Sequence, residues 1–391
     1  MASRDRILVL GTAYGGGNWP PLAAVTVGLH QAGHDVRCFG DDSIAEEFGS
    51  AGMRVEVVTA AASLGTFMAK WRAEGAVGPA PFRPWADVCL PEVRALVDDF
   101  RPRLVVSEIF TSELARLTKA ACGVQWCCVN PGFYFGRDSV RSPDVDYVGR
   151  AAHYWQLFGQ SIEDADLLVH GTDELFDPPP PSLPRHHHYV GPLWWEPSHQ
   201  VPTYLAVPGP PWVLVTLSSA PQPEEMTLAR TALQALSAHA VRVLVTLSPT
   251  HPREELGSVP ANARIERFVS HAAVLSRSCL LVSHGGHGVV TKALYYGVPM
   301  VLVPWDRDQP GVAARAAALG AAEVIARHDL TEPKLVAAIN KVLASRGYYE
   351  NAARVAAHLN ARDAISAARA WIERLRAIPP SLLARADQVI E

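Results

Sequence analysis

Short apolar runs rich in β-branched residues alternate along the chain with Ala- and Leu-rich stretches of helical period. This alternation is typical of βαβ units that build a parallel sheet. In the first half we expect a helix that Gly33 closes and five strands, at 22–33 and at 6–11, 35–40, 54–58, 103–108 and 124–130. In the second half we expect a helix and four strands, at 224–239 and at 212–219, 241–248, 279–286 and 300–305.

A proline-dense segment, residues 177–212, separates the two halves. Proline fixes φ and removes a backbone donor, so this segment cannot form one packed element. It reads as a boundary region that contains one short strand at 187–193. The sequence therefore predicts two α/β domains of similar architecture in succession.

Composition narrows the classes of function. The chain has 391 residues, of which 49% are hydrophobic and 19% charged, and its net charge is −4. The basic residues are dispersed, which argues against a nucleic-acid partner. No apolar run has the length of a membrane span or a signal peptide, so we expect a cytoplasmic protein without a membrane partner. The six cysteines form neither a CxxC pair nor a disulfide framework, and they read as buried or incidental thiols.

The loops that follow the strands are where a doubly wound sheet binds its ligands. In one of them Ser283, His284 and Gly285–Gly288 separate an apolar strand from a helix expected to begin near Val289. Exposed amides and the positive end of a helix dipole bind anions, and glycines let a phosphate approach the backbone. We therefore expect a diphosphate at this loop. The pair Asp308-Gln309 follows at the end of the next apolar strand.

These stretches resemble a known family. The segments "YVGPL" (189–193), "HAAVL" (271–275) and "VSHGGHGVVTKALYYGVPMVLVPWDRDQPGVAARAAALGAAEVI" (282–325) are similar to the donor-binding domain of UDP-glycosyltransferase-like enzymes of the GT-B fold. The likeness is greatest to bacterial enzymes that glycosylate antibiotics and other natural products. It implies two Rossmann-like, doubly wound parallel-sheet domains that face each other across a cleft. Its expected parts are an acceptor domain at 1–195, a linker at 196–211, a nucleotide-sugar domain at 212–365 and a helical segment at 366–391 that crosses back to the first domain.

The resemblance also implies donor-binding residues. A histidine and glycines hold the diphosphate, an aromatic residue packs on the base, and an Asp-Gln pair contacts the sugar. The positions carried over are Ser218, Ser219, Phe268, Val269, His284, Gly285, Gly286, His287, Gly288, Val289, Asp308 and Gln309. Two departures stand out, because Val289 replaces a hydroxyl residue and Lys292 replaces a glutamate that grips the ribose in plant-type enzymes. They favour a dTDP-sugar over a UDP-sugar as co-substrate.

The loop "GGGNWPP" raises a question about the catalytic base. The family has a histidine there, oriented by an aspartate, whereas this chain has Asn18 and Glu108. An amide cannot take a proton, so three accounts remain open. Glu108 is the base, helped by a raised pKa; or the acceptor needs little base assistance; or the chain is a weakened homologue that binds nucleotide sugar or assists a partner.

The resemblance implies an inverting hexosyltransferase with an apolar small-molecule acceptor. Aromatic residues gather in two stretches that we interpret as irregular, 60–90 and 133–158, and these correspond to the family's acceptor loops. The candidate acceptor residues are Trp19, Phe67, Trp71, Trp85, Phe133 and Tyr134. The sequence "DRD" at 306–308 matches the metal-binding motif of another glycosyltransferase fold. The Asp-Gln pair already explains Asp308, so we expect no metal and no cofactor. A homodimer is compatible with the sequence.

Overall fold

The computed structural model describes most of the chain. The residues described are 4–14, 16–50, 52–57, 63–75, 81–135, 155–196, 201–219, 222, 224–267 and 269–377. They form two compact units: the first contains the described residues up to Trp195 together with those from Asp363 onward, and the second contains Glu196–Arg362. None of the described helices combines the length and the apolar character that crossing a membrane requires.

The first unit is built on a parallel sheet of seven strands in the order β3-β2-β1-β4-β5-β6-β7. Central strands of such a sheet are covered on both faces, and the apolar runs of β1 and β4 are buried at every position after Arg6. The strands are β1 (Arg6–Gly11), β2 (Asp35–Gly40), β3 (Arg54–Val57), β4 (Leu104–Glu108), β5 (Gln125–Asn130), β6 (Leu167–His170) and β7 (His187–Tyr189).

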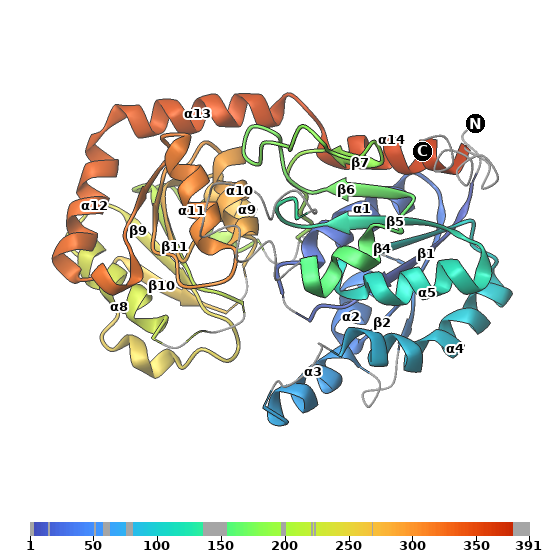
Figure 1. The fold of residues 1–391 in the computed structure, drawn as a ribbon. Helices are drawn as coiled ribbons and strands as arrows, with labels where there is room; N and C mark the ends of the chain where they lie inside the picture. Colours follow the sequence, from blue (N-terminus) through green and yellow to red (C-terminus); the bar gives the residue numbers. More distant parts are fainter. Residues whose placement is uncertain are drawn as a thin grey trace. The chain divides into compact units, whose positions relative to one another are not determined.

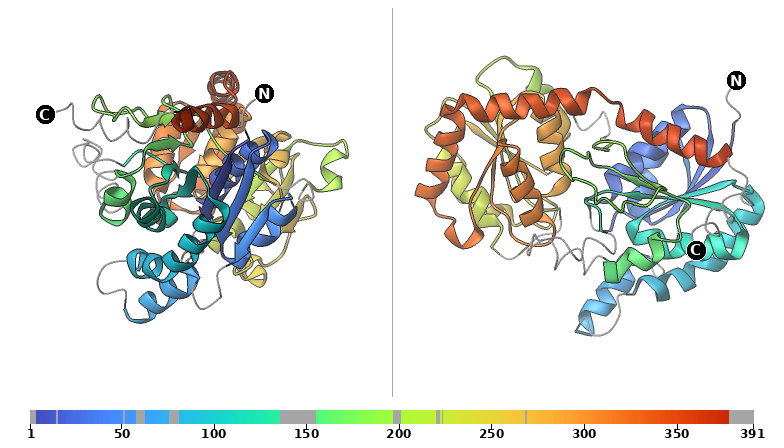
Figure 2. Two further views of the ribbon diagram at one scale, coloured as in Figure 1. Left: turned by 90° about the vertical axis from the view of Figure 1, so that its right-hand side faces the viewer. Right: turned by 45° about the horizontal axis from the view of Figure 1, so that its top comes forward.

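Helices cover both faces of this sheet (Figures 1 and 2). The larger helices are α1 (Trp19–Gln31), α2 (Asp42–Ser50), α3 (Leu64–Ala73), α4 (Phe82–Phe100), α5 (Ser112–Cys122) and α14 (Ala364–Ala377). The short ones are η2 (Ile109–Thr111), η4 (Trp155–Gly159) and α7 (Gln160–Ile162). The interpretation of 60–90 as irregular was wrong, because α3 and the start of α4 occupy much of it.

Helix α14 joins the core of the first unit although it lies at the far end of the sequence. Ala368, Ile372 and Leu375 are buried in the cluster that α1 and the sheet form. A Cβ atom on Gly28 of α1 would lie 2.5 Å from the Ile365 side chain, so glycine allows the two helices to approach. The Trp371 ring of α14 stacks on the imidazole ring of His188 in the same unit.

The second unit has a parallel sheet of six strands in the order β10-β9-β8-β11-β12-β13. Its strands are β8 (Trp212–Thr216), β9 (Arg242–Thr246), β10 (Ala263–Glu266), β11 (Ser278–Ser283), β12 (Met300–Leu302) and β13 (Ala322–Val324). Its larger helices are α8 (Met226–Leu236), α10 (His287–Tyr295), α11 (Gln309–Ala318), α12 (Glu332–Ala344) and α13 (Arg346–Asn360). Its short helices are η6 (Thr203–Ala206), η7 (Arg253–Leu256), α9 (His271–Leu275) and η8 (Arg327–Asp329).

The predicted fold class is confirmed: each unit is a doubly wound α/β sheet in which all the pairs are parallel. In each sheet the strand order reverses between two central strands, which are β1 and β4 in the first unit and β8 and β11 in the second. Ligands of such sheets bind outside the carboxyl ends of the strands at this switch point. Two places therefore qualify as sites, one in each unit.

Candidate functional site

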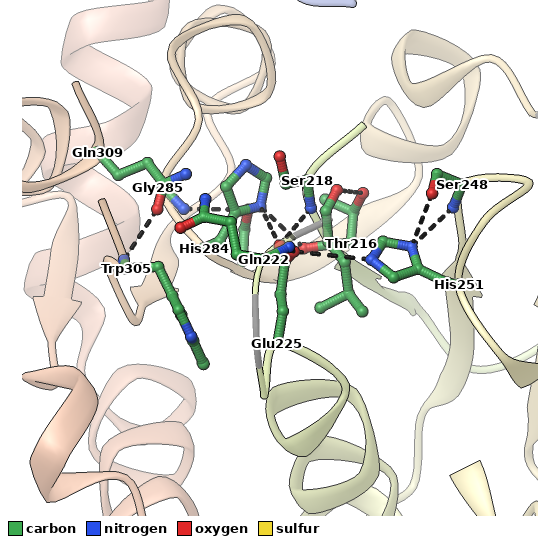
Figure 3. A network of polar contacts seen from close by, with 12 residues as sticks. Thr216, Ser218, Gln222, Glu225, Ser248, His251, His284, Gly285, Trp305 and Gln309 are labelled. Carbon is green, nitrogen blue, oxygen red and sulfur yellow. Dashed lines mark hydrogen bonds and ion pairs between the residues drawn. The ribbon is translucent and has the colours of Figure 1, made fainter. Parts of the chain in front are cut away.

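The switch point of the second unit brings together loops that are far apart in the sequence. Strands β8 and β11 pair side by side, with Thr216 opposite Ser283 at their carboxyl ends. Strand β9 flanks β8, and β12 flanks β11. The polar residues that follow these four strands meet in one network, drawn in Figure 3.

His284 follows β11 directly and is 7% exposed. Its Nδ1 atom lies 3.4 Å from the Thr216 carbonyl oxygen and 3.3 Å from the Ser283 Oγ atom. A carbonyl oxygen can only accept, so Nδ1 carries a proton in this arrangement. The other ring nitrogen, Nε2, would lie 2.6 Å from a Cβ atom on Gly286. Glycine is therefore required at 286 so that the imidazole can reach the start of α10.

Helix α10 begins at His287, two residues before the predicted position, and no side chain caps it. Gly285 turns the chain with a φ of 85°, and Gly286 occupies the N-cap position. The first amides of a helix have no carbonyl partner within it and carry its positive dipole end. Gly288 is exposed and Val289 is buried. The start of this nine-residue helix thus lies beside the ring of His284, an arrangement suited to an anion.

Ser218 and Arg307 connect the β8 and β12 loops. Arg307 donates from Nη2 to the Ser218 Oγ atom at 2.6 Å, and its own backbone has a φ of 61°, a conformation that is rare for a residue with a side chain. Ser218 is buried, whereas the neighbouring Ser219 is exposed. Sequence reasoning identified the serines but missed Arg307.

The Asp308-Gln309 pair lies where β12 leads into α11. Gln309 is buried, and its Oε1 atom accepts from the backbone amides of Trp305 at 2.8 Å and Asp306 at 3.1 Å. Its carbonyl oxygen therefore shapes the loop. Asp308 is half-buried at the N-cap of α11. Within the described residues no group of three or more His, Cys, Asp or Glu side chains is arranged to hold a metal ion.

Glu225 lies at the centre of Figure 3, and sequence reasoning missed it. Its buried carboxylate accepts from the amides of Ser218 and, at 3.1 Å, Gln222. One oxygen is 3.8 Å from His284 Nδ1, and the other is 3.6 Å from His251 Nε2. Burial raises the pKa of this carboxyl, but the two imidazoles and the amide donors outweigh burial and lower it. Burial lowers the pKa of His284, which the nearby Glu225 charge opposes.

A second buried charge pair lies beside α9. Lys292, on α10, pairs with Glu196, whose Oε2 atom also accepts from Ser270 Oγ at 2.6 Å and from the Ala272 amide at 3.0 Å. Burial raises the pKa of Glu196, but Lys292 opposes this and the net shift is downward. Val269 is buried next to Ser270. Phe268, the predicted partner of the base, lies outside the described residues.

In the first unit, Asn18 lies in the segment between β1 and α1, and Glu108 is the last residue of β4. Asn18 is half-buried at the N-cap of α1, where its side chain makes no capping bond. Glu108 is 0% exposed, and its two oxygens accept from the amides of Phe110 at 2.7 Å and Thr111 at 3.0 Å. Burial raises the pKa of the Glu108 carboxyl to about 8. No hydrogen bond joins Asn18 to Glu108 in the part of the chain that the structure describes.

Two further polar residues join this place, and the sequence reasoning missed both. Thr12 follows β1 and donates to the Asp41 Oδ2 atom at 2.6 Å, while the Tyr14 amide donates to the Thr12 hydroxyl at 3.1 Å. The charge of Asp41 adds to the effect of burial on Glu108. A polar residue at the end of β4 or directly after β1 and β2, three adjacent strands, was the signal that could have found them.

The predicted acceptor aromatics divide into two groups. Trp19, Trp85, Phe133 and Tyr134 are all buried. Trp19 packs on Phe48 at 4.5 Å between ring centroids, inside the core. Phe67 and Trp71, both on α3, are half-buried. The buried positions follow the apolar faces of elements such as α4, which the sequence reading took to be irregular.

Partly exposed aromatic surface in the first unit comes from other residues as well. The rings of Tyr14 and Phe110 meet edge-on at 5.9 Å, and both are half-buried. The Tyr14 hydroxyl and the Trp71 Nε1 atom are buried without a hydrogen-bond partner. Buried polar atoms normally have a partner, so these two atoms are among the exceptions in this structure.

Comparison with known proteins confirms the resemblance. Residues 230–366 match the family described as Erythromycin biosynthesis protein CIII-like, C-terminal domain. The chain is 32% identical over 253 residues to 4'-demethylrebeccamycin synthase of Lentzea aerocolonigenes. The aligned region covers 61% of this chain and 57% of that protein. It is 28% identical over 204 residues to a PGL/p-HBAD biosynthesis rhamnosyltransferase of Mycobacterium tuberculosis. That aligned region covers 52% of this chain and 44% of the rhamnosyltransferase. The aligned regions thus span about half the length of these relatives.

Solved structures share the whole fold. The glycotransferase of kitacinnamycin superposes with a TM-score of 0.74 at 21% identity, covering 96% of this chain and all of that one. The glycosyltransferase VinC, solved in complex with dTDP, superposes with a TM-score of 0.67 at 20% identity, covering 95% and 99%. At such identities the likeness establishes the two-domain fold of natural-product glycosyltransferases.

Proposed function

Residues 230–366 match the EryCIII-like C-terminal domain, and from this premise we propose that the chain is a glycosyltransferase of the antibiotic and natural-product type. The observation that carries the proposal is the uncapped start of α10 beside the Nε2 atom of His284, at the switch point of the second unit. Amides, a helix dipole and an imidazole converge there on the space where a diphosphate would bind. We propose a nucleoside diphosphate sugar as the donor.

Each donor residue then has a task. His284 and the amides at Gly286–Val289 hold the diphosphate, while Ser218 and Ser219 contact its distal phosphate. From the resemblance we assign Phe268 and Val269 to the base, and Asp308 and Gln309 to the sugar. A dTDP-sugar is favoured because Lys292 replaces the ribose-binding glutamate of plant-type enzymes and is engaged by Glu196. The complex of VinC with dTDP supports this choice.

The proposed reaction is an inverting transfer. The acceptor oxygen attacks the anomeric carbon as the bond to the diphosphate oxygen breaks, and negative charge develops on the leaving diphosphate. Preorganised donors aimed at that charge stabilise the transition state. His284 and the α10 amides supply them, so the proposal needs no metal ion. The first unit binds the apolar acceptor, with Phe67, Trp71 and Tyr14 as its partly exposed aromatic contacts.

We propose Glu108 as the group that takes the acceptor proton and Asn18 as the group that positions the acceptor. A pKa near 8 is close to the optimum for a general base at neutral pH. Each Glu108 oxygen accepts one amide and keeps a second lone pair, on which it would take the acceptor proton. The other two accounts of the Asn18 and Glu108 pair, an acceptor that needs little base and a weakened homologue, make different predictions for the Glu108→Gln variant.

A nucleotide-sugar-binding accessory protein is the second candidate function, because Asn18 cannot take a proton. Hydrolysis of the donor separates the two. An enzyme should release nucleoside diphosphate slowly from dTDP-glucose or UDP-glucose without acceptor and faster with a panel of polyphenol and macrolide acceptors. His284→Ala should lower this turnover by about 100-fold, as loss of one charge-stabilising donor does elsewhere. His328→Ala, at an exposed imidazole, is the matched control. Binding without any turnover would favour the accessory role.

A further inference from the structure

Glu225 places a buried negative charge next to the site where the proposed function puts another anion. Its side chain is fully buried, and its oxygens accept from the Ser218 and Gln222 amides and lie near two imidazoles (Figure 3). A fixed carboxylate beside a diphosphate repels it unless a positive charge lies between them. The imidazole of His284 is the group in that position.

The protonation state of His284 follows from its contacts. Nδ1 faces the Thr216 carbonyl at 3.4 Å and a Glu225 oxygen at 3.8 Å, and both are acceptors. Nδ1 therefore holds the proton of the neutral ring, and Nε2 presents a lone pair over Gly286. Burial keeps the pKa of His284 low in the free protein. A lone pair cannot bond a phosphate oxygen, so the free form of the ring is not ready for the ligand.

We infer that Glu225 is the positioning residue that lets His284 take up a proton when a nucleoside diphosphate binds. This inference rests on the proposed function. The proton comes from solvent onto Nε2, which then donates to the diphosphate while the Nδ1 side faces Glu225. The resulting series of carboxylate, imidazolium and diphosphate alternates in charge. Glu225 also holds the Ser218 loop through its amide, so one side chain orients both sides of the anion site.

The other charged groups near this imidazole fit the same scheme. His251 accepts the Ser248 amide at Nδ1, 3.0 Å away, so its Nε2 carries the proton that faces Glu225. Glu225 is therefore engaged from both sides, because one oxygen faces His284 and the other faces His251. Arg307, from the β12 loop, opposes protonation of His284 but is directed at the Ser218 hydroxyl. Glu225 is the anion among the described groups that shift the pKa of His284.

The experiment is titration calorimetry with dTDP-glucose and UDP-glucose. Both phosphates of these sugars are diesters and stay singly ionised through the neutral range, so the ligand takes up no proton. Binding at pH 7.5 in buffers of different ionisation enthalpy should show uptake approaching one proton per nucleotide. The Kd should rise by up to tenfold per pH unit from pH 6.5 to 8. An opposite charge at this distance typically shifts a pKa by about 1–3 units, so Glu225→Gln should weaken binding about tenfold or more at pH 7.5 and abolish the uptake.

His251→Gln is the matched control, because it disturbs the same carboxylate from its other side. It should keep the proton uptake, and loss of uptake in this variant would assign the proton to His251 and overturn the inference. Wild-type binding with no uptake and a flat pH dependence would overturn it too, while leaving the proposed function intact. If neither nucleotide sugar binds, the proposed function fails. If Glu225→Gln does not fold, circular dichroism reports it, and the wild-type and His284→Gln titrations decide the question.

Discussion

Replacing Glu108 by Gln tests the buried carboxyl of the first unit through stability as well as activity. The pKa of this group is raised by burial to about 8 from an ordinary value of 4.5. Between those values the folded protein holds one more proton than the unfolded chain. Stability then falls as pH rises, by about 1.4 kcal/mol per pH unit for one proton. The stabilising contribution is fully present below pH 4.5 and is lost as pH approaches 8.

Gln has the same shape but cannot ionise, and it offers one acceptor oxygen to the amides of Phe110 and Thr111. The unpaired amide should cost about 1–3 kcal/mol. At pH 5 we therefore expect Glu108→Gln to be less stable than the parent by that amount. The gap should then close by about 1.4 kcal/mol per pH unit and reverse before pH 8.

Urea denaturation at half-unit steps from pH 5 to 8 measures this directly. Glu92→Gln, at an exposed position of α4, controls for the loss of a surface charge. The difference between parent and variant cancels the titration of all other groups. Parallel curves for parent and Glu108→Gln across the whole range would refute the reasoning, because Glu108 would then be ionised in the folded protein.

The same variant bears on catalysis. If Glu108 is the base, transfer in the parent should rise with pH to a plateau above about 8, and Glu108→Gln should lower it by about 100-fold with little change in donor affinity. A parent-like rate and pH profile in the variant would leave the acceptor-assisted and accessory accounts.

Two further predictions concern the remaining site residues. If the Asn18 amide positions the acceptor as proposed, Asn18→Ala should raise the KM for acceptor at least several-fold with donor affinity unchanged; an altered donor Kd in calorimetry would contradict this. EDTA should leave transfer unchanged, because Asp306 and Asp308 belong to no metal-binding group among the described residues; loss of activity that Mg²⁺ or Mn²⁺ restores would show that the "DRD" sequence holds a metal.

The sequence was sufficient for the frame of the fold. Apolar runs predicted β1, β2, β3, β4, β5, β8, β9, β11 and β12 within three residues at each end, because buried parallel strands carry a continuous apolar signal. Strands β6, β10 and β13 have three or four residues each and were missed. Helix α4 was missed although its buried residues are spaced for a helix, because Pro84 and Pro91 interrupt the pattern.

The candidate site was predictable only where its residues follow one another in the sequence. His284 to Val289 form one segment, so a strand, glycines and a helix in sequence predict where an anion would bind. Glu225 lies 59 residues before His284 and reaches it because β8 and β11 pair out of sequence order. No local pattern distinguishes it from Glu224, whose side chain forms an ion pair with Arg327.

The central claim is that a nucleoside diphosphate binds at the start of α10 beside His284. The direct measurement is the thermal stability of the parent, His284→Ala and His328→Ala with dTDP and with UDP. A ligand at 100 times its Kd stabilises the folded state by about 2.7 kcal/mol. We predict a nucleotide-dependent rise in Tm, larger with dTDP, in the parent and in His328→Ala, and little or none in His284→Ala. An equal rise in all three proteins, or none in the parent, would contradict the claim.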